Sequence, residues 1–177
     1  MKEDLYAEII RATKLILEAE GLSNVGVEVK LGVRATYHRK VGGKVYIQYG
    51  GESIEDKLDL SRGVKYLYRV YEADKLYRYD GEFNNRLTPR ERIACLIIEE
   101  TTHAIASSKG YRGKHGGYFI YTYLETWKKY YYKVMDILKS VSKYENVSID
   151  EMLANVKRLE RVMKAEEELF RRLGLSA

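Results

Sequence analysis

Residues 88–108 read TPRERIACLIIEETTHAIASS, and the fold can be worked out from this stretch outward. Thr88, the proline after it and Glu91 form the pattern of a capping box, which predicts a helix that starts at residue 89. We expect this helix to run to about residue 108, because a glycine follows two residues later. Its middle is apolar on nearly all sides, as is typical of a helix buried inside a protein.

Three ionisable side chains lie within this apolar stretch: Glu99, Glu100 and His103. Residues four apart share a helix face, so Glu99 and His103 should lie side by side, with Glu100 beside them. Burying such groups is costly unless they are paired or bind a metal ion. On this helix alone, two interpretations stay open: a buried Glu–His pair salt-bridged to a nearby arginine, or part of a metal site.

A second histidine, His115, follows His103 by twelve residues, in the glycine-rich segment GKHGGYF of residues 113–119. Two of the three histidines of the chain therefore fall close together. The combined pattern is Glu-Glu-x-x-His on a helix, a turn, and His-Gly-x-x-Phe at the start of the next helix. It resembles the active site of the zincin metalloproteases, most closely the SprT/Spartan-like family, whose pattern is His-Glu-x-x-His followed by His-Gly-x-x-aromatic.

This resemblance implies an α+β fold with a zincin-like core. It also implies that Glu99, His103 and His115 bind a metal ion and that Glu100 is the catalytic general base. The family's first histidine is replaced here by Glu99, yet two histidines and one carboxylate remain an accepted catalytic zinc set. The expected ion is Zn²⁺ or a harder divalent ion such as Mn²⁺, because a carboxylate ligand weakens the Lewis acid. The zinc ribbon of many family members cannot form here, because Cys95 is the single cysteine.

The function implied by the resemblance is that of a metal-dependent peptidase, an enzyme that hydrolyses protein or peptide substrates with a metal-activated water. The expected strand at residues 44–49 could pair with an extended substrate. Tyr121, Tyr123 and Tyr130 are candidates for stabilising the oxyanion, although core packing or helix surface suits each of them better. Two alternatives stay open: a catalytically inactive SprT-like scaffold that binds DNA or a protein partner, and an unrelated helical protein with a chance Glu–His cluster.

The rest of the chain predicts a single α+β domain over residues 1–177, with a small three-stranded sheet and long C-terminal helices. Apolar residues recur at helical spacing between Leu5 and Ala19, alternate over residues 25–31, and alternate again in a hairpin over 34–49 that turns at Gly42-Gly43. Residues 50–87 are ambiguous, since Leu60, Val64, Leu67 and Tyr71 suit a helix but the many tyrosines suit a strand. A further helix is expected at about 117–142, with an apolar stripe that includes Ile120, Leu138 and Val141. A last helix is expected after a capping box at residues 148–151. Its inward-facing residues would be Met152, Val156, Leu159 and Met163.

Composition adds expectations about setting and partners. The net charge is +5, and residues 109–177 carry the whole excess, with 14 Lys and Arg against 9 Asp and Glu, so nucleic acid is a candidate partner. A single Gln among many charged residues is typical of a thermophile protein. No apolar run approaches the about 18–20 residues of a membrane span, and the N-terminal residues do not resemble a signal peptide, so we expect a cytoplasmic protein. His38 is expected in a strand on the face of Ile47, as a structural residue, and Cys95 as a buried apolar one.

Overall fold

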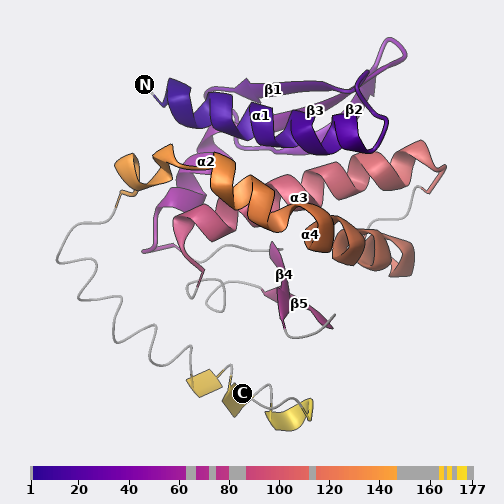
Figure 1. Ribbon diagram of the computed structural model, residues 1–177. Coiled ribbons are helices and arrows are strands. Elements are labelled where there is room, and N and C mark those ends of the chain that lie inside the picture. The colour runs from indigo at the N-terminus through magenta and orange to yellow at the C-terminus, as the bar shows by residue number, and fades with distance from the viewer. Residues whose placement is uncertain are drawn as a thin grey trace.

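A computed structural model describes residues 2–62, 67–71, 75–79, 87–111, 115–146, 164–165, 167–168 and 171–174 of the chain (Figure 1). The fold class is α+β, as predicted, with helices and a small three-stranded mixed sheet. The elements in chain order are α1 (Glu3–Ala19), β1 (Gly26–Lys30), β2 (Tyr37–Val41), β3 (Lys44–Gly50), α2 (Gly51–Leu58), β4 (Leu67–Tyr71), β5 (Lys75–Tyr79), α3 (Pro89–Ser108), α4 (Gly117–Ile137) and the 3₁₀ helix η2 (Ser140–Lys143).

The three-stranded sheet has the strand order β1-β3-β2, with β3 parallel to β1 and antiparallel to β2. The predicted hairpin is confirmed: Gly42 and Gly43 form its turn with φ of 56° and 80°, values that favour glycine. One expectation about this sheet is wrong. Because β3 is the central strand, its backbone groups already pair on both sides, so residues 44–49 cannot take up a substrate strand. Strands β1 and β2 form the edges instead.

Helix α1 covers one face of this sheet, and the apolar stripe predicted for this helix is confirmed. Leu5, Ile9 and Ile16 are completely buried, and they belong to the same core as Ile47 of β3. The hydroxyl groups of Thr13 in α1 and Tyr49 in β3 lie 2.8 Å apart and share a buried hydrogen bond. The helix and the central strand are therefore joined by a polar contact as well as by apolar packing.

Helix α3 is the central element of the core. Its capping box is formed as predicted, and 15 of its 20 residues are buried. It packs against α1, α2, α4 and the sheet. In Figure 1 it runs through the middle of the molecule, with α1 and its sheet on one side and the β4–β5 hairpin on the other. A helix surrounded in this way needs apolar residues on all faces, which explains its composition.

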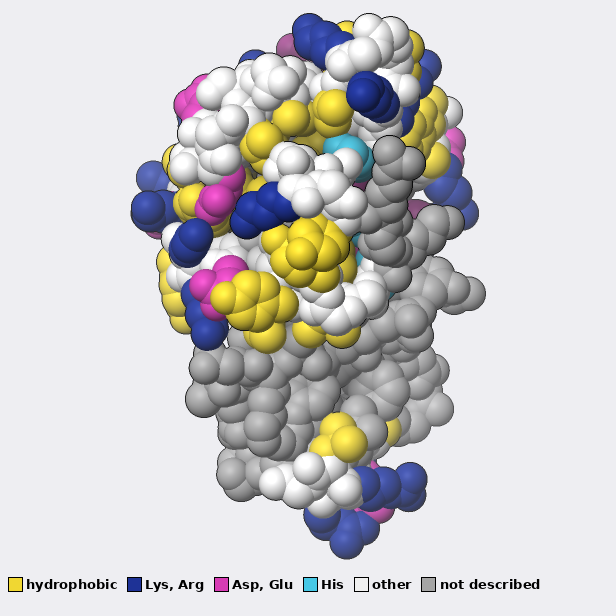
Figure 2. Space-filling model, turned by 90° about the vertical axis from the view of Figure 1, so that its right-hand side faces the viewer, with side chains coloured by type: hydrophobic (Ala, Val, Ile, Leu, Met, Phe, Trp, Pro, Cys, Tyr) yellow, Lys and Arg dark blue, Asp and Glu magenta, His cyan; other side chains and the backbone are white. Residues whose placement is uncertain are grey.

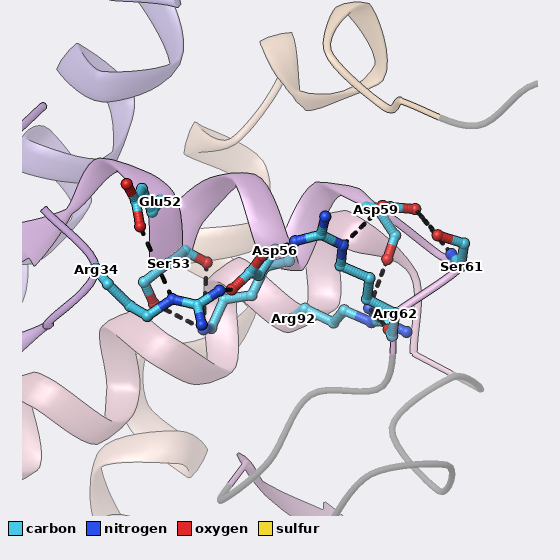
Figure 3. Close-up of polar contacts among 9 residues, drawn as sticks. Arg34, Glu52, Ser53, Asp56, Asp59, Ser61, Arg62 and Arg92 are labelled. Carbon is cyan, nitrogen blue, oxygen red and sulfur yellow. Dashed lines mark hydrogen bonds and ion pairs between the residues drawn. The ribbon is translucent and has the colours of Figure 1, made fainter. Parts of the chain in front are cut away.

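A buried arginine joins α3 to the loop after α2 (Figure 3). Arg92 is 0% exposed. Its guanidinium donates hydrogen bonds to the backbone carbonyls of Leu87 at 3.3 Å, Asp59 at 3.2 Å and Arg62 at 2.8 Å. The side chains of Arg62 and Arg34 both pair with Asp56 on the surface of α2. Arg92 therefore joins the start of α3 to the loop after α2 through three hydrogen bonds to backbone carbonyls.

Arg92→Met is expected to lower the free energy of unfolding by about 2–4 kcal/mol, because it removes three hydrogen bonds that a completely buried side chain donates. Arg34→Met is the matched control: Arg34 is exposed, so losing its ion pair with Asp56 should cost less than about 1 kcal/mol. Urea unfolding at pH 7 measures both values. Equal losses in the two variants would contradict the role assigned to Arg92.

Two expectations about helices are corrected. The helical interpretation of Leu67 and Tyr71 is wrong and the strand interpretation is right, because β4 pairs with β5 in an antiparallel hairpin. The predicted helix at 117–142 ends at Ile137. The backbone N–H and the hydroxyl of Ser140 donate to the carboxylate of Glu8 in α1, and this contact accompanies a separate turn, η2.

The apolar stripe predicted for this helix is right only in part. Leu138 and Val141 are buried, but Ile120 is exposed, and Phe119 and Tyr123 are buried in its place. The helix predicted after the capping box at 148–151, with Met152, Val156, Leu159 and Met163, lies outside the described residues. Within the described part of the chain, no helix is both long and apolar enough to cross a membrane.

Candidate metal centre

Two structural elements bring the three predicted metal ligands together. Glu99 and His103 lie one turn apart on α3, and His115 lies just before the N-terminus of α4. His115 has φ of 50°, and no other non-glycine residue in the described ranges has a positive φ. A left-handed conformation costs a residue with a side chain about 1–2 kcal/mol. Strain of this kind is typical of residues held in place for function.

The ligand atoms of Glu99, His103 and His115, here called the ligand cluster, all lie within 4.8 Å of one another. The two histidine Nε2 atoms are 3.1 Å apart, and Oε1 of Glu99 is 3.3 Å from Nε2 of His115. Two Zn–N bonds of about 2.0–2.1 Å at a tetrahedral angle place their nitrogen atoms about 3.3 Å apart. The ligand cluster is therefore close enough to hold one metal ion.

Phe119 packs against both imidazole rings. Its ring centroid lies 4.6 Å from that of His103 and 4.5 Å from that of His115, and its side chain is buried. It is the aromatic residue of the His-Gly-x-x-Phe pattern. The two histidine rings themselves stack with centroids 5.0 Å apart. Histidine side chains reach the surface on one face of the molecule, next to hydrophobic side chains (Figure 2). The side chain of His115 is 26% exposed, so the ligand cluster can be reached from solvent at this residue.

Glu100, the predicted general base, lies in a low-dielectric environment. It is 6% exposed, and its Oε2 atom is buried with no hydrogen-bond partner among the described residues. Burial, reinforced by the charge of Glu99, raises the pKa of Glu100 to about 8, while Lys57 opposes this shift. A buried acceptor without a donor, beside a second buried carboxylate, is the arrangement that a cation would stabilise. The chemistry of the donors therefore fits a divalent metal ion.

His103 is neutral over the physiological range. Burial, the neighbouring His115 and the more distant His38 together lower the pKa of His103 to about 4. Metal ions bind the neutral imidazole, so protons compete with a metal at His103 only in acid. This side chain is ready to act as a ligand at neutral pH.

Lys57 of α2 is a residue of the site that sequence analysis missed. It is 7% exposed, and its Nζ donates to the hydroxyl of Ser53 at 3.0 Å. Burial lowers the pKa of Lys57, and the carboxylates of Glu99 and Glu100 oppose this shift. The sequence could have indicated the burial of Lys57 only through its position, because Lys57 lies on the same buried face of α2 as Ile54 and Leu58. Lysine is so rarely buried that a sequence pattern assigns it to the surface.

The other predicted residues are not members of the ligand cluster. The hydroxyl of Tyr130 donates to Glu20 at 2.7 Å, and that of Tyr123 is hydrogen-bonded with Cys95, so both are engaged elsewhere. Tyr121 is 62% exposed. Cys95 is completely buried, which confirms its interpretation as a small apolar residue.

The metal-free protein should lose stability as the pH rises from about 6.5 to 8. In this window the folded state keeps a proton on Glu100, whose pKa is about 8, whereas the unfolded state, with a pKa of 4.5, has lost it. His103 has the opposite effect, but only between pH 6.5 and about 4, where its folded form resists protonation. The expected loss is about 1.4 kcal/mol per pH unit, measured by urea unfolding with a chelator present. Glu100→Gln, as the control, should remove this slope; an unchanged slope would contradict the assignment.

Comparison with known proteins adds nothing to this geometry. No protein-family model matches the chain, and no curated protein or solved structure matches it. The functional proposal therefore depends on the ligand cluster and on the buried carboxylate of Glu100 beside it.

Proposed function

We propose that this protein is a metal-dependent peptidase whose zincin-like core is similar to that of the SprT-like proteases. One observation carries the proposal: the ligand atoms of Glu99, His103 and His115 converge within 4.8 Å, from helix α3 and the segment before α4, in the order of the family's pattern. The unpartnered, buried Oε2 of Glu100 supports it, because this residue follows Glu99 directly on α3. A chance pair of buried polar residues does not explain a third ligand supplied by another segment.

The ligand cluster would hold Zn²⁺ or Mn²⁺. Two imidazoles and one carboxylate suit both ions, and the carboxylate of Glu99 favours a harder ion than three histidines would. When bound, a divalent cation supplies Lewis acidity, which polarises a substrate carbonyl and makes water easier to deprotonate.

Glu100 acts as the general base of the proposed reaction. Positive charge at the ligand cluster lowers the pKa of Glu100 from its raised metal-free value, so its carboxylate becomes available to accept a proton. It takes this proton from the attacking water and passes it to the leaving amine. Lys57, whose charge also favours ionised Glu100, helps to keep this carboxylate in the basic form.

An extended protein or peptide substrate is proposed to pair with β2. This strand is an edge of the sheet, and α3 packs against it. Among the described residues, β2 pairs on one side only, so a peptide added to its other edge would form main-chain hydrogen bonds along the strand. This choice replaces residues 44–49, which are already paired on both sides.

Elemental analysis combined with hydrolysis of fluorescently labelled casein tests the proposal. Protein purified without chelator should carry about one equivalent of Zn²⁺ or Mn²⁺, cleave casein, and lose both properties on treatment with chelator. Glu99→His restores the family's full pattern and should bind zinc more tightly. Protein that binds no metal and leaves casein intact would refute the peptidase proposal.

The second candidate, an inactive scaffold that binds DNA, is favoured by one observation, the confinement of the +5 charge to residues 109–177. Binding of this kind weakens steeply with salt, because it releases counterions from the phosphates. Salt-sensitive DNA binding by a protein that holds metal but leaves casein intact would favour this candidate.

A further inference from the structure

The three-stranded sheet has one face toward the core and one face away from it. Side chains alternate along each strand, and residues paired across strands project from the same face. Val27 and Ile47 belong to the core, and His38, which pairs with Ile47, projects from their face as predicted. The alternate residues form the opposite face, here called the outer face: Gly26, Glu28 and Lys30 of β1, Tyr37, Arg39 and Val41 of β2, and Lys44, Tyr46 and Gln48 of β3. None of them belongs to the core that the described residues form.

Two tyrosines of the outer face can be reached from solvent. Tyr37 and Tyr46 are both partly exposed. The ring of Tyr46 rests against β1 at Gly26, because a Cβ atom at this glycine would lie 2.5 Å from Cδ1 and 2.7 Å from Cε1 of the ring. Tyr37 pairs with Gln48, two residues after Tyr46, so the tyrosines are diagonal neighbours about 7–8 Å apart. The outer face therefore presents two neighbouring aromatic side chains.

Positive charge lies beside both rings. The Nζ atom of Lys44 is 5.3 Å from the ring centroid of Tyr46, and the guanidinium carbon of Arg39 is 5.5 Å from that of Tyr37. Lys30 adds a third cation, and both lysines are exposed. The aromatic surface is therefore also a cationic one.

Arg39 is paired only weakly with Glu28, the single acidic residue of the outer face. Its Nη2 atom lies 3.3 Å from Oε1 of Glu28, and the two side chains are 39% and 44% exposed, so the ion pair contributes little. The Nε atom of Arg39 and both amide atoms of Gln48 are buried without a hydrogen-bond partner among the described residues. Arginine binds a phosphate through two parallel hydrogen bonds, a stronger contact than this ion pair. Charge and hydrogen-bonding capacity both favour a phosphate-bearing ligand.

We propose that the outer face binds single-stranded nucleic acid. Unpaired bases stack on Tyr37 and Tyr46, and Lys30, Arg39 and Lys44 contact the phosphates between them. Aromatic residues on a sheet face hold neighbouring bases in the same way in common RNA-binding modules. A duplex keeps its bases inside the helix, so it would use the cations and not the rings. This surface contains no residue of the ligand cluster and none of residues 109–177, so it is separate from both candidate functions above.

Fluorescence anisotropy with a labelled oligodeoxythymidine of about 12 nucleotides tests the proposal. Tyr46→Leu should weaken binding about tenfold, the effect of losing one stacked base, whereas Tyr46→Phe keeps the ring and should bind like the wild type. Lys44→Gln should reduce the slope of log affinity against log salt by about 0.7, the value for one phosphate contact on a single strand. Lys133→Gln is the matched control: Lys133 is exposed on α4, and its Nζ atom lies 5.9 Å from the ring centroid of Tyr130. It should change neither affinity nor slope.

The same strand paired with its complement should bind about tenfold more weakly, because its bases cannot stack on the tyrosines. Equal affinity for the duplex, or for polyglutamate, would show attraction to negative charge alone and overturn the stacking role. A loss in Lys133→Gln but not in Lys44→Gln would move the binding surface to α4. Absence of binding at about 50 mM salt would refute the proposal outright. Urea unfolding checks each variant, and if Tyr46→Leu does not fold, the exposed Lys44→Gln still decides the result.

This outcome is independent of the peptidase function. Chelator should leave the affinity for the strand unchanged, and a protein that cleaves casein without binding the strand would refute only the role of the outer face.

Discussion

Glu100→Gln is expected to abolish peptide hydrolysis while leaving the metal content unchanged. Glutamine has nearly the shape of glutamate but cannot accept a proton, and Glu100 is not part of the ligand cluster. Removal of a general base lowers kcat by about 10²–10⁴-fold. Initial rates with labelled casein, measured beside elemental analysis of the same sample, check both halves of this result.

Measuring the stability of the Glu100→Gln variant will exclude unfolding as the cause of the lost activity. Because burial raises the pKa of Glu100 to about 8, a neutral amide in its place should make the metal-free protein more stable at pH 8, not less. Glu125→Gln, on the surface of α4, is the matched control and should keep full activity. Activity retained in Glu100→Gln would mean that another group takes the proton of water.

His103→Ala and His115→Asn are expected to lose the metal. Each variant keeps two of the three ligands. Removing a residue that only hydrogen-bonds to a metal ligand lowers metal affinity about 10–100-fold, so the loss of a ligand itself should lower it further. Asparagine is chosen at position 115 because it tolerates the positive φ of 50° better than most residues, so the backbone is not disturbed. Equilibrium dialysis against Zn²⁺ measures the affinities.

Ser107→Ala is the control for this experiment, since Ser107 is exposed on α3 one turn after His103. It should bind metal like the wild type. If His103→Ala still carried one equivalent of metal after dialysis, the ion would be held elsewhere, and the proposed site would be wrong. Loss of metal in both histidine variants, with folding preserved, is the outcome that the geometry predicts.

The features of α3 could be predicted because they are local in sequence. A capping box marks where the helix starts, an apolar composition on all sides indicates burial, and a spacing of four places Glu99 beside His103. The pairing with His115 depended on a motif, because periodicity alone says nothing about how a following segment folds back. The short distance between the two Nε2 atoms bears out that expectation.

The features that could not be predicted depend on contacts between distant residues. The central position of β3 requires β1 to pair beside it in parallel, which no alternation of residues reveals. Helix α4 ends earlier than its apolar stripe suggests, where Ser140 bonds Glu8, 132 residues away in sequence. Lys57 approaches the ligand cluster only because α2 packs against α3.

The central position of α3 has a consequence for how much of the protein a cell contains. The helix that would bind the ion is also the helix around which the core is built, so any ion bound there stabilises the whole fold. An ion present at 100 times its dissociation constant adds about 2.7 kcal/mol to the free energy of unfolding. Changes of this size alter the unfolded fraction that proteases degrade, and so alter abundance. If an ion is bound there, metal starvation should then lower the amount of the protein in the cell.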